Sequence, residues 1–472
     1  MSSEKHQESQ DSKVEEVSVS SQHIDPEEER KLVRKIDGRI MPITCLLYLF
    51  SYLDRSNLGN ARLQGLPQDT LHGDPTGHLF DWVNSVFYFS YVLCLVPASV
   101  TSKLFPPRLW LCCVAAGWGL SSTLMATAFD FAGLMTGRIF LGVFEAGFAP
   151  TIPLYFTFFY TRAEMGLRMA YWYAFAAVAG TFGGLIAFGV QNADISIHKW
   201  RLLFIIEGCP AIITGLVALL FLPDRPELTS FFNERERAIA LDRMNRGSSA
   251  DVGAQVTKAH IFLAFCDWRC YAGGVIYFGL NCALASISAF LPTILASFGF
   301  IPPYAVAAIM LVSFSIASNR MQTRGIFRFA ACTTAGIGYV ILLAVPSNVH
   351  ARYFAVFCIV SGTYTTIGCL LTTGITLLLV AHNLGSETKR ATGIPIFMSM
   401  GQCGSVLGSH LFPLTEVCCA LEFLGAIVSL CLSISYHRAN TRRDALYGPS
   451  HPDARVDTSE LADKANDFRY VI

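Results

Sequence analysis

The stretch Gly137–Pro150, GRIFLGVFEAGFAP, places two charged residues, Arg138 and Glu145, in a segment that is otherwise apolar. Seven residues make about two helical turns, roughly 10.5 Å of rise, so both side chains return to nearly the same helix face. Gly142 lies between them and would let a neighbouring helix or a ligand come close. A charge at mid-membrane costs at least about 2.5–3.5 kcal/mol, so ionisable residues there usually face a protein interior or a water-filled pathway. We interpret the stretch as part of a substrate and proton pathway; a structural ion pair or a charge reaching the interface is the alternative.

The composition is that of an integral membrane protein. The 472 residues are 53% hydrophobic and only 15% charged, with a mean hydropathy of +0.44, whereas soluble domains carry roughly 25% charged residues. The net charge of zero argues against a nucleic-acid partner. Most of the 15 cysteines lie in apolar runs, without the spacing of a zinc site or a disulfide framework, so we expect packing cysteines, no metal and no cofactor.

Apolar segments of about 20 residues, the length that crosses a bilayer, recur along the chain in two sets. The first set covers 40–58, 79–102, 109–129, 131–157, 168–191 and 201–222. The second set covers 270–296, 301–318, 326–345, 353–381, 391–413 and 417–436. The sequence therefore predicts an all-α integral membrane protein with twelve transmembrane helices, six in each half.

Charged segments divide this chain into five parts. We expect a disordered cytosolic tail at 1–38, an N-terminal six-helix bundle at 39–222, a cytosolic middle loop at 223–267, a C-terminal six-helix bundle at 268–437 and a cytosolic tail at 438–472. Lys and Arg cluster before the first span and in alternate loops, which by the positive-inside rule puts both termini in the cytosol. The middle loop contains NERERAIALDRMNR, which we interpret as a solvated linker helix on the cytosolic face.

Three further acidic residues lie within the apolar spans. Asp54 precedes Arg55 near the end of the first span, in SYLDRSNLGNA, and adjacent helical residues point about 100° apart, so these two need not pair with each other. Glu207 lies about two turns from Arg201, which we expect to be its structural partner. Glu422 receives no role from the sequence.

Such a set of residues suits proton-coupled anion transport. A buried carboxylate whose proton affinity depends on a nearby arginine can exchange a proton at working pH. An anionic substrate that binds Arg55 would draw this arginine away from the acid and favour protonation, so anion and proton would assist each other's binding. Arginine suits the anion because its planar fork holds a carboxylate with two hydrogen bonds.

Several motifs together resemble the major facilitator superfamily, and more narrowly its anion:cation symporter branch in the fungal allantoate, nicotinate and vitamin permease group. These motifs are DRSNLGNA, GRIFLGVFEAGFAPTIPLYFTFFYTRAEMGLRMA, HNLGSETKRATGIP and GQCGSVLGSHLFP. The resemblance covers roughly 30–445 and implies two six-helix bundles around a central cavity, working by alternating access. On the matching positions it implies proton-coupling sites at Asp54 and Glu145, and substrate binding at Arg55 and Arg138. Arg138 alternatively takes a coupling or structural role.

The sequence departs from this family pattern in the second half. Asn319 precedes Arg320 where the family usually has Asp, and Phe300-Ile301 joins two spans with almost no outer loop. The connection near Thr415–Cys418 is equally short, and LTTGITLL lengthens the span at 353–381. We therefore expect an imperfect C-terminal bundle, whether in the protein itself or through an error in the gene model.

No phosphate-binding loop, HExxH or GxSxG motif in a credible context is present, so we predict no enzyme and no catalytic residues. The function that we predict is proton-coupled symport of a small organic anion, a carboxylate such as nicotinate, allantoate or a related vitamin. We expect a monomer in the plasma membrane, whose partners are the lipid bilayer, the anion and protons. Export of a secondary metabolite, or a non-transporting sensor or inactive family member, stays open.

Overall fold

The computed structural model describes most of the chain and is helical throughout the described part. The described residues are 25–75, 77–102, 104–194, 196–247, 262–263, 265–296, 309–310, 313–314, 317, 324–345, 348–372, 387–410 and 415–448. Most of the predicted span 301–318, the pair Asn319-Arg320, the Phe300-Ile301 connection and most of LTTGITLL lie outside these residues.

The N-terminal half contains a run of long helices joined by short connections. Its helices are α2 (Pro26–Leu63), α3 (Leu66–Thr70), α4 (His78–Ser102), α5 (Pro107–Met125), α6 (Phe131–Glu145), α7 (Thr151–Phe156), α8 (Arg162–Asn192) and α9 (Lys199–Phe221). A short 3-10 turn, Pro226–Leu228, and the helix α10 (Glu234–Gly247) follow. Every span predicted for this half overlaps one of these helices.

The described helices of the C-terminal half are α12 (Trp268–Ala296), α14 (Arg324–Ala344), α15 (Val349–Thr372), α17 (Glu387–His410) and α18 (Thr415–Tyr447). Across the described part of the chain, six helices are long and apolar enough to cross a membrane. These are α2, α4, α8, α9, α14 and α18 over all or most of their lengths.

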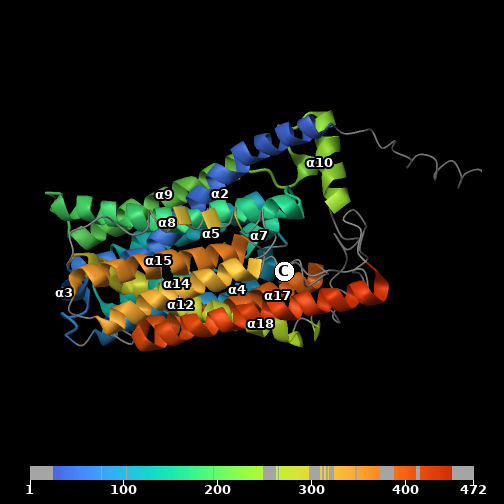
Figure 1. Ribbon diagram of the computed structural model, residues 1–472. Coiled ribbons are helices and arrows are strands. Elements are labelled where there is room, and N and C mark those ends of the chain that lie inside the picture. Colours follow the sequence, from blue (N-terminus) through green and yellow to red (C-terminus); the bar gives the residue numbers. More distant parts are fainter. Residues whose placement is uncertain are drawn as a thin grey trace, which may run out of the picture.

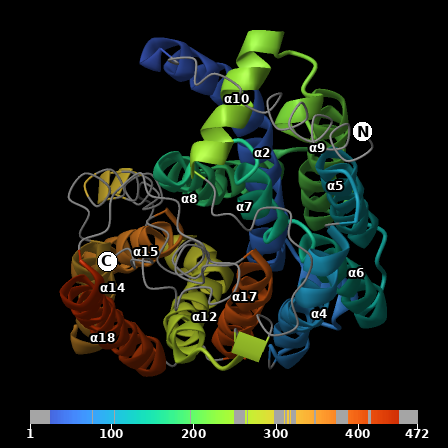
Figure 2. The same cartoon turned by 90° about the vertical axis from the view of Figure 1, so that its right-hand side faces the viewer.

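The two halves lie side by side with their long helices roughly parallel, as Figures 1 and 2 show. In the first half α2 packs against α8 and α9, α5 against α9, and α4 against α6. In the second half α12 packs against α17, and α14 against α15 and α18. Among the described helices, the halves contact each other most extensively through three pairs: α4 with α17, α8 with α15, and α2 with α12. The helix α2 therefore contacts both halves.

The helix α2 begins earlier than the sequence predicted. The Asp25 side chain caps it by accepting a hydrogen bond from the backbone N–H of Glu27 at 2.9 Å, and Pro26 takes the first helical position. The segment 26–38, which we assigned to a disordered tail, is therefore helical. The signals that the sequence analysis missed were this cap and the acidic residues of the first turn. Their negative charges interact favourably with the positive N-terminal end of the helix dipole.

The segment predicted as one span at 131–157 is broken. The helix α6 ends at Glu145, turns occupy 146–150, and the short α7 begins at Thr151. Glu145 thus lies at the last turn of α6, where the backbone leaves the helix. Pro150 and Pro153 explain part of the break, because proline lacks the backbone N–H that continues a helix.

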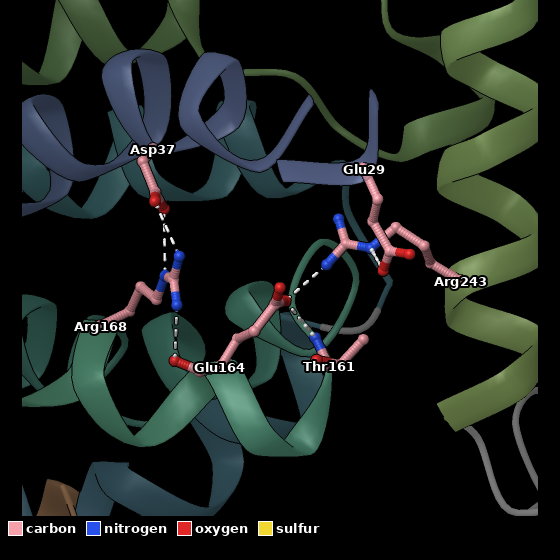
Figure 3. A network of polar contacts seen from close by, with 6 residues as sticks. All are labelled: Glu29, Asp37, Thr161, Glu164, Arg168 and Arg243. Atoms are coloured by element: carbon pink, nitrogen blue, oxygen red, sulfur yellow. Dashed lines mark hydrogen bonds and ion pairs between the residues drawn. The ribbon is translucent and has the colours of Figure 1, made fainter. Parts of the chain in front are cut away.

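The middle-loop helix α10 is not the solvated linker that the sequence suggested. It stands against the projecting start of α2 (Figure 1), and Ile239, Ala240 and Arg243 are buried. The Arg243 guanidinium contacts Glu29 of α2 at 2.9 Å and Glu164 of α8 at 2.5 Å, and nearby Arg168 contacts Asp37 at 2.8 Å (Figure 3). We call these residues the α10 network.

Candidate functional site

Arg55 and Glu145 form an ion pair between α2 and the end of α6. The Arg55 Nη2 atom donates to Glu145 Oε1 at 2.7 Å, and the same oxygen accepts a hydrogen bond from Ser51 Oγ at 2.5 Å. Glu145 is 2% exposed by side chain, whereas Arg55 is 20% exposed. The acid is thus sealed within the protein while its cation keeps a face that another group can reach.

Aromatic rings surround the Arg55 guanidinium. Its central carbon lies 5.1 Å from the centre of the Phe87 ring and 5.2 Å from that of Tyr91, both on α4. Rings at this distance attract a cation through their negative faces. Tyr277 of α12 is close enough to act electrostatically on Arg55, so the site also faces the C-terminal half.

Asp54 points toward α5 and not to Arg55, which the 100° offset between adjacent helical residues had left open. Its Oδ1 atom accepts a hydrogen bond from Ser122 Oγ at 2.5 Å, and its Oδ2 atom is buried with no hydrogen-bond partner among the described residues. Asp54 is fully buried and interacts electrostatically with Glu145 and Arg138. The structure therefore brings Asp54 into one electrostatic cluster with the other predicted residues.

Arg138 is buried on α6 but forms no ion pair within the described residues. It is 1% exposed, and its Nε and Nη2 atoms have no hydrogen-bond partner in the described part of the chain. Gly142, one turn further along, lies against α4, where an added Cβ would come within 2.5 Å of the Phe87 carbonyl oxygen. The glycine thus permits the close approach that positions α6 beside the aromatic residues around Arg55.

The expected pairing of Glu207 with Arg201 is wrong. Both Glu207 oxygens are buried without a hydrogen-bond partner. Arg201 instead donates to the Ala128 carbonyl at 3.2 Å and lies over the rings of Phe129 and Trp200. Arg201 lies in the first turn of α9, where it reaches this carbonyl and the two aromatic faces and not Glu207. Glu422, which the sequence left without a role, is buried near Thr363 in the C-terminal half.

Sequence reasoning missed the uncharged partners at the site. Ser51 lies one turn before Arg55 on the same face of α2, a spacing that could have indicated it. Ser122 and Tyr364 gave no such signal, because their contacts come from helices far away in the sequence. Tyr364 of α15 places its hydroxyl 2.6 Å from that of Tyr52, which joins the two halves next to the ion pair.

The site can hold charge but offers no metal centre in the part of the chain that the structure describes. There, no three His, Cys, Asp or Glu side chains are grouped to bind a metal ion. What the site does hold is one partly exposed cation, three buried charged groups and several buried polar atoms without partners. Buried polar atoms are nearly always hydrogen-bonded in proteins, so these atoms indicate a place for protons, water or a ligand.

A bundle of membrane-length helices with a charged cluster where its two halves meet defines a membrane transport protein rather than an enzyme. The model of the Major Facilitator Superfamily matches residues 44–409, and the chain belongs to this family. It is accordingly an integral, multi-pass membrane transporter of that type.

Relatives and solved structures agree with this assignment. The chain is 31% identical to the major facilitator-type transporter hxnP of Emericella nidulans, over 95% of this chain and 94% of the relative. It is 28% identical to the high-affinity nicotinic acid transporter of Saccharomyces cerevisiae, over 94% of this chain and 85% of that relative. The fold is similar to that of the proton:xylose symporter XylE, with a TM-score of 0.64 at 13% identity, covering 85% of this chain and 96% of that one.

Proposed function

We propose that this transporter carries a small organic anion together with protons, by alternating access. The ion pair between Arg55 and Glu145 carries the proposal, because it joins a partly exposed cation to a sealed acid. An anion that reached Arg55 would compete with Glu145 for its donors. Glu145 would then lose its compensating charge and favour its protonated form, so that each ligand would strengthen the binding of the other.

In this proposal Arg55 contacts the substrate anion, and Arg138 adds positive potential or a second contact. Glu145 and Asp54 bind the coupled protons. The rings of Phe87 and Tyr91 beside Arg55 would suit a planar carboxylate such as nicotinate. The relative that transports nicotinic acid, at 28% identity, makes nicotinate the first compound to try.

We further propose that the protein works as a monomer in the plasma membrane, with both termini and α10 on the cytosolic side. The Lys and Arg residues that gather before the first span and in the middle loop support this orientation. The functional units would be the two bundles at 39–222 and 268–437, moving against each other around the site.

The test is uptake of labelled nicotinate, and of a panel of other carboxylates, by vesicles containing the purified full chain, with and without an inward pH gradient. We expect the gradient to accelerate uptake and a protonophore to abolish this acceleration. Arg55→Ala should reduce uptake at least tenfold, and Glu145→Gln should remove the response to the gradient.

Arg62→Ala is the matched control. Arg62 lies on the same helix and over the Phe80 ring at 4.7 Å, so it resembles Arg55 in setting but lies outside the site. Its replacement should leave uptake near the level of the unchanged protein. Gradient-driven uptake that survived both Arg55→Ala and Glu145→Gln would refute the proposed site.

A further inference from the structure

Glu207 is the most deeply isolated acid of the N-terminal half. Its side chain is on α9, it is 1% exposed, and neither of its oxygens has a hydrogen-bond partner among the described residues. An ionised carboxylate buried without partners is far too costly to persist, so such a group neutralises itself by holding a proton. The sequence suggested Arg201 as a partner that would stabilise the ionised form of Glu207. Arg201 instead donates to the Ala128 carbonyl.

Two helices bring Glu207 to the same level as Asp54. The α9 start is tied to the end of α2 through α3, because Trp200 Nε1 donates to Asp69 at 2.7 Å. Glu207 is eight residues beyond Lys199, about 12 Å along its helix, and Asp54 is nine residues before Leu63, about 13.5 Å along its own. Since α2 and α9 pack against each other, the two acids lie at matching depths.

The helix α5 contacts both Asp54 and the helical turn that contains Glu207. Ser122 donates to Asp54 at 2.5 Å, and the next residue, Thr123, lies against the residue after Glu207. A Cβ added to Gly208 would come within 2.5 Å of Thr123 Oγ1. Consecutive residues of one helix thus contact Asp54 on one side and the Glu207 turn on the other.

The charges around this pair are few. Within the described residues, Asp54 is the titratable group whose charge acts on Glu207. The facing groups of α5 are the hydroxyls of Ser122 and Thr123. The charged residues of α8 lie in its first two turns, Arg162–Arg168, at the far end of that helix. Glu145 and Arg138 of α6 act on the pair through their electrostatic interactions with Asp54.

We infer that Glu207 is a third proton-binding residue of the coupling site, beside Asp54 and Glu145, and that it forms an acid pair with Asp54 where α2, α5 and α9 meet. Both acids are buried and the charge of Asp54 acts on Glu207, so the two do not ionise independently and their protons leave in coupled steps. The inference rests on the proposed function in one respect, that the protons of this pair take part in transport. That the pair binds protons does not depend on the proposed function.

Infrared difference spectroscopy of the purified full chain in lipid vesicles, recorded across a pH series, tests the pair directly. It follows the carbonyl stretch of protonated carboxyl groups and needs no substrate. Among the titration steps of the unchanged protein, two should be coupled and belong to Asp54 and Glu207. Glu207→Gln should lose one of these two steps and shift the Asp54 step, and Asp54→Asn should lose the other and shift the Glu207 step. Glu207→Asp should retain both.

Glu422→Gln is the control, because Glu422 is equally buried but belongs to the C-terminal half beside Thr363. Its replacement should leave the coupling between the two steps intact. The inference is overturned if the Asp54 step is the same with and without Glu207, or if the Asp54→Asn protein shows no titrating carboxyl at Glu207. Failure of gradient-driven uptake in the unchanged protein would instead refute the proposed function and leave these spectra interpretable.

Discussion

The hydroxyl groups of Tyr52 and Tyr364 lie 2.6 Å apart, so that one hydrogen bond joins α2 of the first half to α15 of the second. Both residues are buried in a cluster with Leu53, Val356 and Val360. Tyr52 precedes Arg55 by three residues on α2. Any movement that separates the halves at this level must break this hydrogen bond.

Replacing Tyr52 with Phe should therefore shift the balance between conformations of the two halves. A hydrogen bond of this kind contributes about 1 kcal/mol net, which corresponds to a change of about fivefold in a conformational equilibrium. Distance measurements between one spectroscopic label on each half should show the more separated population increasing by about this factor. Tyr48→Phe is the control, since the Tyr48 ring packs on Trp172 and Tyr173 of the same half. Identical distance distributions in Tyr52→Phe and the unchanged protein would contradict the prediction.

The Arg55–Glu145 pair should show strong coupling in a double-mutant cycle. Arg55→Ala leaves the buried Glu145 without its cation, and breaking a buried pair from one side can cost about 3–5 kcal/mol, less here because Arg55 is partly exposed. Arg55→Ala with Glu145→Gln removes both charges and should recover part of the loss. We expect a coupling of about 0.5–3 kcal/mol, measured by thermal unfolding of the purified variants. Strictly additive effects would show that the pair does not stabilise the protein.

The sequence predicted the helical membrane architecture and the identity of the charged residues. Hydropathy located the spans because lipid demands long apolar helices, and the cost of burying charge singled out Asp54, Arg55, Arg138 and Glu145. Which of these residues contact each other could not be predicted from the sequence. That Arg55, and not Arg138, contacts Glu145 depends on tertiary packing, which brings α2 to the end of α6 across 90 residues of sequence.

The misassigned contacts share a physical cause. Glu207 and Arg201 are near in sequence and opposite in charge, but α9 packs its Glu207 face against α5 and leaves Arg201 at the helix end. The α10 helix was expected in solvent because it is highly charged, and its charges turned out to meet opposite charges on α2 and α8. Local spacing reports which face a residue occupies, and only packing decides what that face meets.

Gly142 should be intolerant of a side chain. An added Cβ would collide with Ser90 Oγ and lie 2.5 Å from the Phe87 carbonyl oxygen, and a backbone atom cannot move aside as a flexible side chain can. We expect Gly142→Ala to lower the unfolding temperature and to reduce uptake by disturbing the position of α4. Gly184→Ala is the matched control, because nothing lies within 4 Å of its added Cβ. That change should be neutral or stabilising by up to about 1 kcal/mol, as alanine favours helices over glycine. Equal effects at both positions would argue against close α4–α6 packing.

Arg243 should hold α10 against the rest of the N-terminal half. Its side chain is 1% exposed and contacts both Glu29 and Glu164, so Arg243→Ala would leave two carboxylates facing each other (Figure 3). We expect faster hydrogen exchange and easier proteolysis across Glu234–Gly247. Arg235→Ala provides the comparison: this arginine is 75% exposed and its contact with Glu28 is a surface pair, worth about 1 kcal/mol at most. Protection that persists in Arg243→Ala would mean that the other contacts of α10, among them those of Ile239 and Ala240, suffice to hold the helix.

The contact between Lys35 of α2 and Glu236 of α10 should make this attachment sensitive to pH. Burial raises the pKa of Glu236, but hydrogen bonds from the Lys35 ammonium at 2.7 Å and the Asn233 backbone, with the Lys35 charge, outweigh it and lower the pKa below its ordinary value. A lowered pKa in the folded state contributes stability above the pKa of the unfolded chain, and this contribution is lost as the pH falls through the folded value. Glu236→Gln should therefore be less stable than the unchanged protein at neutral pH, by about 1 kcal/mol or less. The difference should disappear in acid, as thermal unfolding at a series of pH values would reveal. A difference that grew on acidification would mean that the carboxylate does not stabilise the attachment of α10.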